Sequence, residues 1–510
     1  MYRIAIPFFA LAILTAWFAP SRAAERPNIV LIYTDDVGYG DVSCNGQTTL
    51  RTPNIDRIAA EGVRHTDAHC SAATCTPSRF ALLTGRYAFR QPGTGIARGD
   101  ANMIIGPDTL TLPALLKQAG YTTAVIGKWH LGLGDGPIDW NKEIRRNPQD
   151  VGFDYHFLIP ATGDRVPCVY VEQGRVVGLD PADPIRVSFG KRIDPNPSGA
   201  EVPPGSLKQM WSHGHNQTIV NGISRIGWMT GGQKARWVDE DMADTITHKA
   251  EEFLEQHRQE PFFLYFSTHD IHVPRVPHPR FQGKSGLGWR GDAMLQLDWC
   301  VGQILDKLDA LGLRDDTLVI FTSDNGPVLD DGYVDQANEL LGEHRPNGPY
   351  RAGKYSSFEG GTRVPCLVRW PGHVSPGTTS QALVGQVDWA ASLAALVGAS
   401  VPADQCIDSR NQIDALLGKD PVGRPHLIHE ARNLALRQGH WKYIPPGQIR
   451  DGLGPWTTVS ISRPGALYDL NQAIDERVDV AAEHPQILAQ MQELHQRILA
   501  GADQPDRLGQ

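Results

Sequence analysis

Four oxygen-bearing side chains stand directly after two strongly apolar segments of the chain. Asp35 and Asp36 follow the run PNIVLIYT, and Asp324 and Asn325 follow the run DTLVIFTS. Carboxylate and amide oxygens are hard ligands, which suit Ca²⁺ or Mg²⁺ better than a soft metal. Each pair alone is more typical of a turn or a helix cap than of a metal site. If the two runs are neighbouring buried strands, however, these side chains need a cation to relieve their repulsion.

A second group of side chains could bind an anion. It comprises one arginine, two lysines and two histidines: Arg79, Lys128, His130, His272 and Lys354. Each residue alone is more typical of a solvated charge or of a structural histidine. Fixed cations beside a metal ion suit a tetrahedral oxyanion, because charge-assisted hydrogen bonds are strong. The combination favours a sulfate or phosphate ester as the ligand and leaves the nucleophile to be found.

The segment HCSAATCTPSRF holds the candidate nucleophile. Cys75 stands directly before a predicted helix whose first turn accommodates Pro77 and whose apolar positions begin at Phe80. The chain has seven cysteines, and in an exported protein a disulfide from Cys75 to Cys70 or to another cysteine is the ordinary expectation. A reactive thiol at a helix start is the alternative, and the sequence cannot choose the pairing.

Four apolar, β-rich runs carry these side chains. They are residues 27–34, 121–128, 261–268 and 316–323. The segments between them that are typical of helices are residues 54–63, 111–120, 241–259 and 293–312. Strands that alternate with helices indicate an α/β fold, with a parallel sheet covered on both faces. Because ligands of such sheets bind beyond the carboxyl ends of the strands, the polar clusters that follow the runs predict one shared site.

The length and charge of the chain limit the possible functions. Its 510 residues are enough for one large α/β domain and a smaller one. A net charge of −9 argues against general nucleic-acid binding. After about residue 400 the pattern changes to paired short strands and a closing helix. We therefore predict a catalytic domain over residues 24–400 and a smaller α+β subdomain over residues 401–510.

Residues 1–23 are typical of a secretory signal peptide. Arg3 supplies the positive start, the run IAIPFFALAILTAWFA is apolar, and small residues surround Ala23. A membrane anchor is the alternative, but the run is short and contains Pro7. No later segment is long enough to span a bilayer, so we expect an exported, periplasmic or secreted protein without a membrane span.

The order of motifs along the chain resembles that of the type I, formylglycine-dependent sulfatases. The segment Cys75-Thr76-Pro77-Ser78-Arg79 matches the family signature Cys-X-Pro-X-Arg. Further segments resemble family motifs in the family's order and span nearly the whole mature chain: PNIVLIYTDDVGYGD, LLTGRY, GKWHLG, TSDNG, GKYSSFEGGTRVP and LYDLN. The character of the chain is most similar to secreted bacterial arylsulfatases and polysaccharide sulfatases.

This resemblance implies an alkaline-phosphatase-like fold, with a large mixed sheet sandwiched by helices, and one Ca²⁺ ion. The implied metal ligands are Asp35, Asp36, Asp324, Asn325 and, once it is oxidised to formylglycine, Cys75. In the family this oxidation is performed by formylglycine-generating enzyme or by anaerobic sulfatase-maturing enzyme. The positions that steady the formylglycine, bind sulfate or transfer protons fall on Arg79, Lys128, His130, His272 and Lys354. The pattern His-X-Pro favours His272 over His269.

The implied chemistry is hydrolysis of a sulfate ester through a formylglycine hydrate. One hydroxyl of the hydrate attacks sulfur; deprotonation of the other reforms the aldehyde and expels sulfate by C–O cleavage. The metal lowers the pKa of the hydrate. His130 is the implied base, and His272, with Lys354, protonates the departing oxygen. The substrate is then a sulfated carbohydrate or an aryl sulfate.

Two other functions fit part of the pattern. A phosphatase or phosphodiesterase of the same superfamily would carry Thr or Ser in place of Cys75 and usually two metal ions. A sulfoglycan-binding protein without activity would keep the fold, but every expected catalytic residue is present in this chain.

The sequence says least about the residues that surround the entrance to the substrate site. The loop over residues 205–232, together with a charged pair before it, offers these candidates: Trp211, His213, His215, Trp228, Asp164 and Arg165. A loop held together by its own tryptophans is an equally good interpretation. The sugar, the sulfated position, exo or endo action and the oligomeric state stay open.

Overall fold

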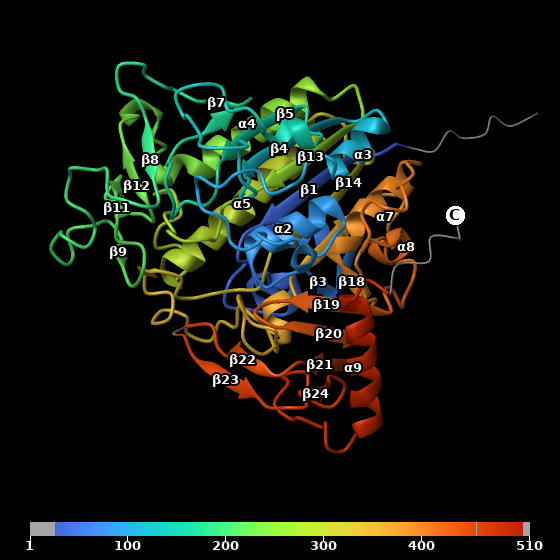
Figure 1. Ribbon diagram of the computed structural model, residues 1–510. Helices are drawn as coiled ribbons and strands as arrows, with labels where there is room; N and C mark the ends of the chain where they lie inside the picture. Colours follow the sequence, from blue (N-terminus) through green and yellow to red (C-terminus); the bar gives the residue numbers. More distant parts are fainter. Residues whose placement is uncertain (1–25, 455, 503–510) are drawn as a thin grey trace, which may run out of the picture.

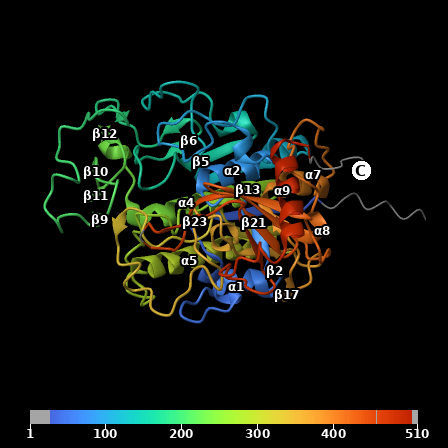
Figure 2. The same cartoon turned by 60° about the horizontal axis from the view of Figure 1, so that its bottom comes forward.

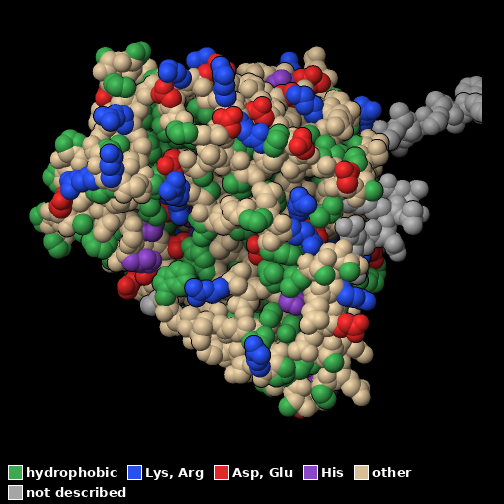
Figure 3. All heavy atoms as spheres, viewed as in Figure 1, with side chains coloured by type: hydrophobic (Ala, Val, Ile, Leu, Met, Phe, Trp, Pro, Cys, Tyr) green, Lys and Arg blue, Asp and Glu red, His purple; other side chains and the backbone are tan. Residues whose placement is uncertain are grey.

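The computed structural model describes residues 26–454 and 456–502. The signal peptide predicted over residues 1–23 lies outside the described residues. Within them, no helix combines the length and the apolar character that a membrane span needs. On the face of the molecule in Figure 3, Lys and Arg side chains are interspersed with Asp and Glu side chains.

A ten-stranded sheet forms the centre of the molecule (Figure 1). Its five middle strands are parallel, in the order β14 (Thr317–Ser323), β1 (Asn28–Thr34), β13 (Phe262–Ser267), β4 (Thr122–Lys128) and β5 (Tyr155–Ile159). Almost all of their side chains are buried, because helices cover both faces, and this explains the continuous apolar runs. Strands β1, β4, β13 and β14 are the four that the sequence predicted.

Antiparallel neighbours at both edges make the sheet mixed. Short strands extend it beyond β14 and beyond β5: β16 (Cys366–Arg369), β2 (Val63–His65), β17 (Thr378–Ser380), β6 (Val171–Glu172) and β7 (Arg175–Val176). The expected α/β fold with a large mixed sheet is therefore confirmed. The parallel arrangement inferred from strand–helix alternation holds for the middle five strands.

Two layers of helices cover the sheet. On one face, α5 packs against both α1 and α4; the bounds are α1 (Pro53–Ala60), α4 (Met242–Gln256) and α5 (Gly288–Ala310). On the other face lie α2 (Cys75–Thr84), α3 (Leu112–Gln118), α7 (Trp389–Leu396) and α8 (Ile413–Leu416). Figure 2 shows α1 and α5 on the side of the sheet opposite α2 and α7. All ten residues of α2 are buried.

A four-stranded antiparallel sheet with one long helix forms the lower part of Figure 1. The elements are β19 (His426–Glu430), β20 (Leu434–Gln438), β21 (Trp441–Ile444), β24 (Ala466–Asp469) and α9 (Pro485–Leu499). A hairpin of β22 (Gly447–Arg450) and β23 (Thr458–Ile461) projects from it. Ahead of this sheet, α8 packs against α7 of the large layer. The division into domains at residue 400 stays a prediction.

Residues 163–235 form long loops with short ladders, at the left of Figure 1. Besides β6 and β7 at the edge of the large sheet, their strands are β8 (Arg186–Ser188), β9 (Met210–Trp211), β10 (Ile219–Val220), β11 (Ile223–Ser224) and β12 (Trp228–Thr230). Apart from short 3-10 helices, the remaining elements of the described chain are β3 (Ala68–His69), β15 (Tyr333–Val334), β18 (Val384–Gly385) and α6 (Glu359–Thr362).

Candidate active site

The carboxyl edge of the parallel strands gathers the predicted oxygen ligands. Thr34 of β1 pairs with Ser323 of β14, so the residues that follow the two strands emerge side by side. Asp35, Asp36, Asp324 and Asn325 are all completely buried. Carboxylate oxygens of the three aspartates lie within 4.8 Å of one another. The Asn325 side chain donates from Nδ2 to Asp36 Oδ1 at 2.7 Å.

Two buried oxygen atoms in this group have no hydrogen-bond partner among the described residues: Asp35 Oδ1 and Asn325 Oδ1. An unpartnered buried oxygen is costly, so it needs a ligand. The donors are all hard oxygens, which fit Ca²⁺. Asp36 also holds a left-handed backbone conformation, with φ at +62°. Such strain in a non-glycine residue is concentrated at functional sites.

Lys128 and Arg79 neutralise part of this charge from β4 and α2. The Lys128 Nζ atom lies 2.6 Å from Asp35 Oδ2 and 3.5 Å from Asp324 Oδ2. The Arg79 guanidinium lies 2.8 Å from Asp324 Oδ2 and donates from Nη1 to Ser267 Oγ at 2.5 Å. Burial opposes ionisation of Asp35, but Lys128, His272, His269 and Arg79 together outweigh it and keep the pKa of this carboxyl well below its usual value.

Lys354 approaches the cluster from a loop. Its Nζ atom lies 2.8 Å from Asp36 Oδ1 and 2.9 Å from Asp331 Oδ2. Burial raises the pKa of Asp36 to about 6, although Lys354 opposes the shift. Asp331 was not predicted from the sequence. It also accepts a hydrogen bond from the Tyr355 hydroxyl at 3.0 Å, and only its position after SDNG in the sequence could have suggested it.

Cys75 opens α2 and is almost completely buried, at 1% exposure. It is a free thiol, so the disulfide reading is not realised in this structure. The neighbouring Cys70 donates from Sγ to the carbonyl oxygens of Ala72 and Thr362, each at 3.2 Å. Burial raises the pKa of Cys75, opposed by Lys128 and Lys354. Both lysines are thus close enough to Cys75 to affect its ionisation.

His130 is oriented as a neutral base. Its Nε2 atom lies 2.9 Å from the carbonyl oxygen of Ala97, which only accepts, so Nε2 carries the hydrogen. The Nδ1 atom is buried and has no hydrogen-bond partner in the part of the chain that the structure describes. Burial, followed by Lys128 and Arg165, lowers the pKa of His130 well below its usual value. The Nδ1 lone pair is therefore free to accept a proton.

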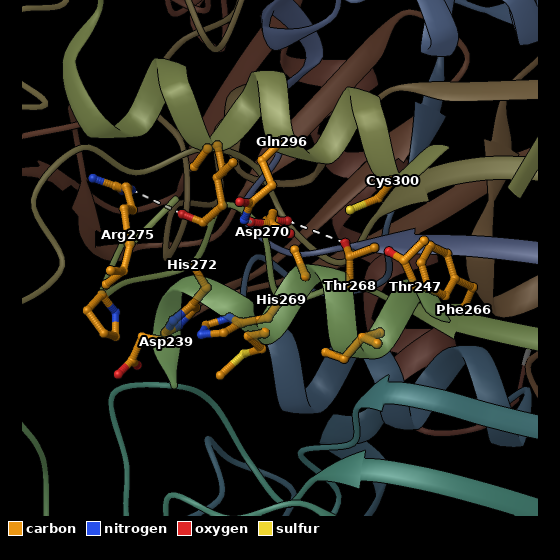
Figure 4. Close-up of a pocket in the computed structure, with 17 residues that line it drawn as sticks. Asp239, Thr247, Phe266, Thr268, His269, Asp270, His272, Arg275, Gln296 and Cys300 are labelled. Carbon is orange, nitrogen blue, oxygen red and sulfur yellow. Dashed lines mark hydrogen bonds between the residues drawn. The ribbon is translucent and has the colours of Figure 1, made fainter. Parts of the chain in front are cut away.

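The two histidines after β13, whose rings lie next to each other in Figure 4, have different partners. His269 accepts at Nε2 a hydrogen bond of 3.0 Å from the backbone N–H of Gly163. His272 donates from Nδ1 to the carbonyl oxygen of Val273 at 2.7 Å. One ring nitrogen of His272 lies within 4.8 Å of oxygens of Asp36 and Asp331. These contacts indicate that His269 positions the loop that contains Gly163. They leave the Nε2 atom of His272 available to a ligand of the site.

The two hollows next to these residues differ in size. The cavity in Figure 4, between the loop after β13 and helices α4 and α5, has a volume of about 30 Å³. That is space for about one water molecule. A pocket of about 590 Å³ includes Thr74 and Pro77, which flank Cys75, and Tyr355, which follows Lys354. Its position and size suit a substrate, and its outer wall comes from β19 and the β22–β23 hairpin.

The tryptophans of the predicted aromatic rim contact neighbouring residues of the irregular region 163–235. Trp211 donates from Nε1 to the carbonyl oxygen of Gly199 at 2.9 Å, and the Arg192 guanidinium lies over the Trp228 ring. These contacts favour the structural interpretation of the tryptophans. His213 is exposed beside Asp330, at 3.9 Å.

The charged pair of Asp164 and Arg165 lies near Cys75. Asp164 binds Arg165 at 2.6 Å and His215 at 2.9 Å. Burial opposes the ionisation of Arg165, whereas Asp164 and then Cys75 raise its pKa. Arg165 therefore lies within electrostatic reach of Cys75.

Comparisons with known proteins agree with this geometry. The Sulfatase family model matches residues 27–399. The chain is 53% identical over 476 residues to an N-acetylgalactosamine-6-O-sulfatase of Bacteroides thetaiotaomicron, covering 92% of this chain and 93% of the relative. It is 34% identical to mouse steryl-sulfatase, covering 84% of this chain and 71% of the relative.

Solved structures are similar as well. A 6S sulfatase from work on glycosaminoglycan metabolism by Bacteroides thetaiotaomicron superposes with a TM-score of 0.89 at 52% identity, covering 93% of this chain and 99% of that one. The PsFucS1 sulfatase from Pseudoalteromonas, at 24% identity and a TM-score of 0.70, shares the fold; the match covers 94% and 91% of the two chains.

Proposed function

The chain belongs to the sulfatase family, and on this premise we propose that it hydrolyses the 6-sulfate ester of N-acetylgalactosamine in a sulfated carbohydrate. The observation that carries the proposal is the buried cluster of acidic, amide and basic side chains beside Cys75. The substrate follows from the 53% identity to the N-acetylgalactosamine-6-O-sulfatase. A phosphatase reading has less support, because Cys75 stands where that class carries Thr or Ser.

One Ca²⁺ ion would be held by the oxygens of Asp35, Asp36, Asp324 and Asn325. When bound, such an ion polarises the reacting oxygens and stabilises negative charge. The four carboxylates of Asp35, Asp36, Asp324 and Asp331 face the three cations of Arg79, Lys128 and Lys354, which leaves one negative charge. A divalent cation reverses the sign of this sum, which suits an anionic sulfate ester.

The Cys75 thiol stands for the unconverted side chain. Formylglycine, once formed there and hydrated by one water molecule, would supply two hydroxyls on one carbon: one to attack sulfur and one whose deprotonation expels sulfate. The ammonium groups of Lys128 and Lys354 lie beside this position and would bind the sulfate oxygens. His130 Nδ1 would accept the proton that sulfate release requires. His272 Nε2, in its protonated form, would donate to the departing sugar oxygen, with Lys354 as a second donor.

Export and maturation complete the proposal. Residues 1–23 would direct the chain to the periplasm or the medium. A formylglycine-generating or anaerobic sulfatase-maturing enzyme would convert Cys75 before folding buries it. The order follows from burial, because the folded chain exposes only 1% of Cys75.

The test combines turnover with peptide mass. Protein produced with a maturation enzyme should release sulfate from N-acetylgalactosamine-6-sulfate, and the peptide with position 75 should carry the aldehyde mass. Cys75→Ala should lower turnover by at least about 10³-fold, because the nucleophile is lost. Cys44→Ser, outside the site, is the matched control and should keep full activity. A fully active protein with an unmodified Cys75 would overturn the proposed mechanism, and activity restricted to the 4-sulfate isomer would overturn the proposed substrate.

A further inference from the structure

Arg450 is a buried cation in the wall of the substrate pocket that the mechanism does not use. It ends β22 and is only 4% exposed. The pocket that it lines, of about 590 Å³, also includes Thr74 and Pro77, on either side of Cys75. The C-terminal hairpin thus brings a guanidinium to a hollow whose wall includes residues close to Cys75 in the sequence.

The hydrogen-bonding capacity of Arg450 is not used up within the protein. Its Nη2 atom donates to the carbonyl oxygen of Gly454 at 2.8 Å. The Nε and Nη1 atoms are buried and have no hydrogen-bond partner among the described residues. A buried guanidinium that lacks acceptors is costly, so its retention points to an acceptor that comes with a ligand.

Aromatic rings fix the guanidinium in place. Its central carbon lies 4.1 Å from the centre of the Trp456 ring and 5.2 Å from the centre of the Tyr355 ring. Trp456 is 56% exposed, so much of its ring is available to a ligand. An aromatic face beside a directed guanidinium is suited to a sugar ring that carries an anionic group.

The pocket extends beyond a single sugar ring. Arg432 and Gln448 line it and also line a second hollow of about 530 Å³. Both side chains are exposed. A ligand that reaches from Cys75 past Arg450 therefore has space for at least one further ring.

We propose that Arg450 binds an anionic group on the sugar next to the sulfated one, so that the enzyme prefers an oligosaccharide with a uronate at that position. The inference rests on the proposed function and adds the neighbouring residue to it. A carboxylate and a second sulfate share the required chemistry, since both accept two parallel hydrogen bonds from a guanidinium. The uronate carboxylate is the favoured source, because it lies on a separate ring, and the pocket has room for that ring.

The experiment uses the mature protein and four substrates with the same reacting sulfate. They are the sulfated monosaccharide, its disaccharide with a uronic acid, the carboxyl-reduced disaccharide and a monosaccharide with a second sulfate. Arg450→Gln should lower kcat/KM on the uronate disaccharide by about 10- to 100-fold, mainly through KM. On the monosaccharide and the carboxyl-reduced disaccharide the change should stay within about 2-fold. Arg477→Gln, an exposed arginine that does not line the pocket, is the control.

Each outcome supports the inference or overturns it. Equal losses on all four substrates would make Arg450 a structural residue of the hairpin and overturn it. A loss confined to the doubly sulfated sugar would assign the second sulfate instead and overturn the uronate assignment. If Arg450→Gln fails to fold, the wild-type preference for the uronate disaccharide over its reduced form decides, and the absence of any preference refutes the proposal.

A failure of the proposed function has a different signature. In that case the wild-type protein would release no sulfate from any of the four substrates. Binding of the unsulfated uronate disaccharide, measured by calorimetry against its reduced form, still tests Arg450. The wild type should bind the uronate form at least about 10-fold more tightly, and Arg450→Gln should remove the difference.

Discussion

Two buried groups of charged side chains in this molecule have similar compositions, but they differ in the balance between carboxylates and cations. The site cluster consists of Asp35, Asp36, Asp324, Asp331, Arg79, Lys128 and Lys354. The subdomain cluster joins the C-terminal sheet to the large domain and consists of Asp67, Glu359, Glu476, Arg363, Arg437 and Lys442. Both are almost completely buried, so burial alone does not separate them.

The subdomain cluster neutralises itself. Glu359 contacts Arg363 at 2.6 Å, Lys442 at 2.9 Å and Arg437 at 3.2 Å. Three carboxyl groups, of which Glu476 is partly protonated near neutral pH, face three cations, so this cluster has no excess of negative charge. Glu359 also lies near His69 and His429, in an arrangement that could suggest a metal site. The three cations around Glu359 already compensate it, so a further cation would be repelled.

The site cluster, in contrast, has more negative than positive charge. It has one more carboxylate than cations, and among the described residues the carboxyl oxygen Asp35 Oδ1 and the adjacent amide oxygen Asn325 Oδ1 have no hydrogen-bond partner. In the subdomain cluster Glu476 Oε1 also lacks a hydrogen bond within the described part of the chain, but it lies 3.2 Å from the ammonium group of Lys442. The ring nitrogens of the nearby His429 have no hydrogen-bond partner there either, but burial lowers the pKa of this ring and keeps it neutral. The difference teaches that an excess of carboxylates over cations marks a ligand site, whereas a buried network in which cations match the carboxylates marks a structural joint.

The largest expected effect comes from neutralising one carboxylate in each cluster. Asp324→Asn should reduce kcat/KM by at least about 10³-fold, because Arg79 loses its partner and the metal loses a ligand. Glu359→Gln should lower the free energy of unfolding by about 3–5 kcal/mol, because buried cations lose their counter-ion. The folded fraction of Glu359→Gln should keep a kcat within about 3-fold of the wild type. Steady-state kinetics with denaturant unfolding measures both; a reversed pattern would remove the distinction.

Calcium should act on one cluster alone. Removal of Ca²⁺ by a chelator should abolish turnover and lower the Tm of the wild type and of Glu359→Gln alike. Calcium at about 100 times Kd should restore about 2.7 kcal/mol of stability to both. Asp324→Asn should show a much smaller shift, because its site is incomplete. Differential scanning calorimetry with and without calcium measures the shift, and an equal response of Asp324→Asn would place the ion elsewhere.

The two histidines after β13 give a smaller contrast. His272→Ala should impair hydrolysis of a sulfated sugar about 10²–10³-fold more than hydrolysis of a nitrophenyl sulfate, whose leaving group needs little protonation. His269→Gln keeps an acceptor for the N–H of Gly163 and should show no dependence on the leaving group. Steady-state rates of both variants on the two substrates measure this dependence on the leaving group. Equal losses for His272→Ala on both would remove its role as the acid.

The smallest effect concerns a proton within the subdomain cluster. Burial raises the pKa of Glu476 to about 7, against an ordinary value of 4.5. The folded state then binds the proton more tightly than the unfolded state, so stability falls as pH rises from about 4.5 to 7. Relative to Glu476→Gln, the wild type should lose about 1–3 kcal/mol between pH 5 and pH 8. Urea unfolding measures the difference, with the exposed Glu483→Gln as control; parallel pH profiles would contradict it.

Much of the fold was readable from local patterns. The apolar runs at residues 27–34 and 316–323 are β1 and β14, because a strand buried on both faces must be apolar at successive positions. The ordered motifs identified the sulfatase family, which the family match confirms. Strands such as β2 and β6 went unpredicted, because two or three residues carry no periodicity.

The sequence predicted the contacts of loop residues less accurately. Trp211 and Trp228 were candidates for a sugar-binding rim, yet they contact Gly199 and Arg192 of the same irregular region. Asp331 and Arg450 were not singled out, although the first contacts Lys354 and the second lines the pocket. Loop residues have no repeat that predicts their partners, so their position depends on the packing of distant segments.

The sequence by itself determined the residue types of the site and the strand ends that carry them. Parallel strands end at one edge, so Asp35, Asp36, Asp324 and Asn325 were bound to meet once β1 and β14 were recognised as neighbours. The tertiary structure alone decided which atoms are left without partners and which distant residues complete the pocket. The reason is physical: hydrogen-bond satisfaction and burial depend on every segment that packs around an atom, and only the folded chain brings Arg450 to the pocket beside Cys75.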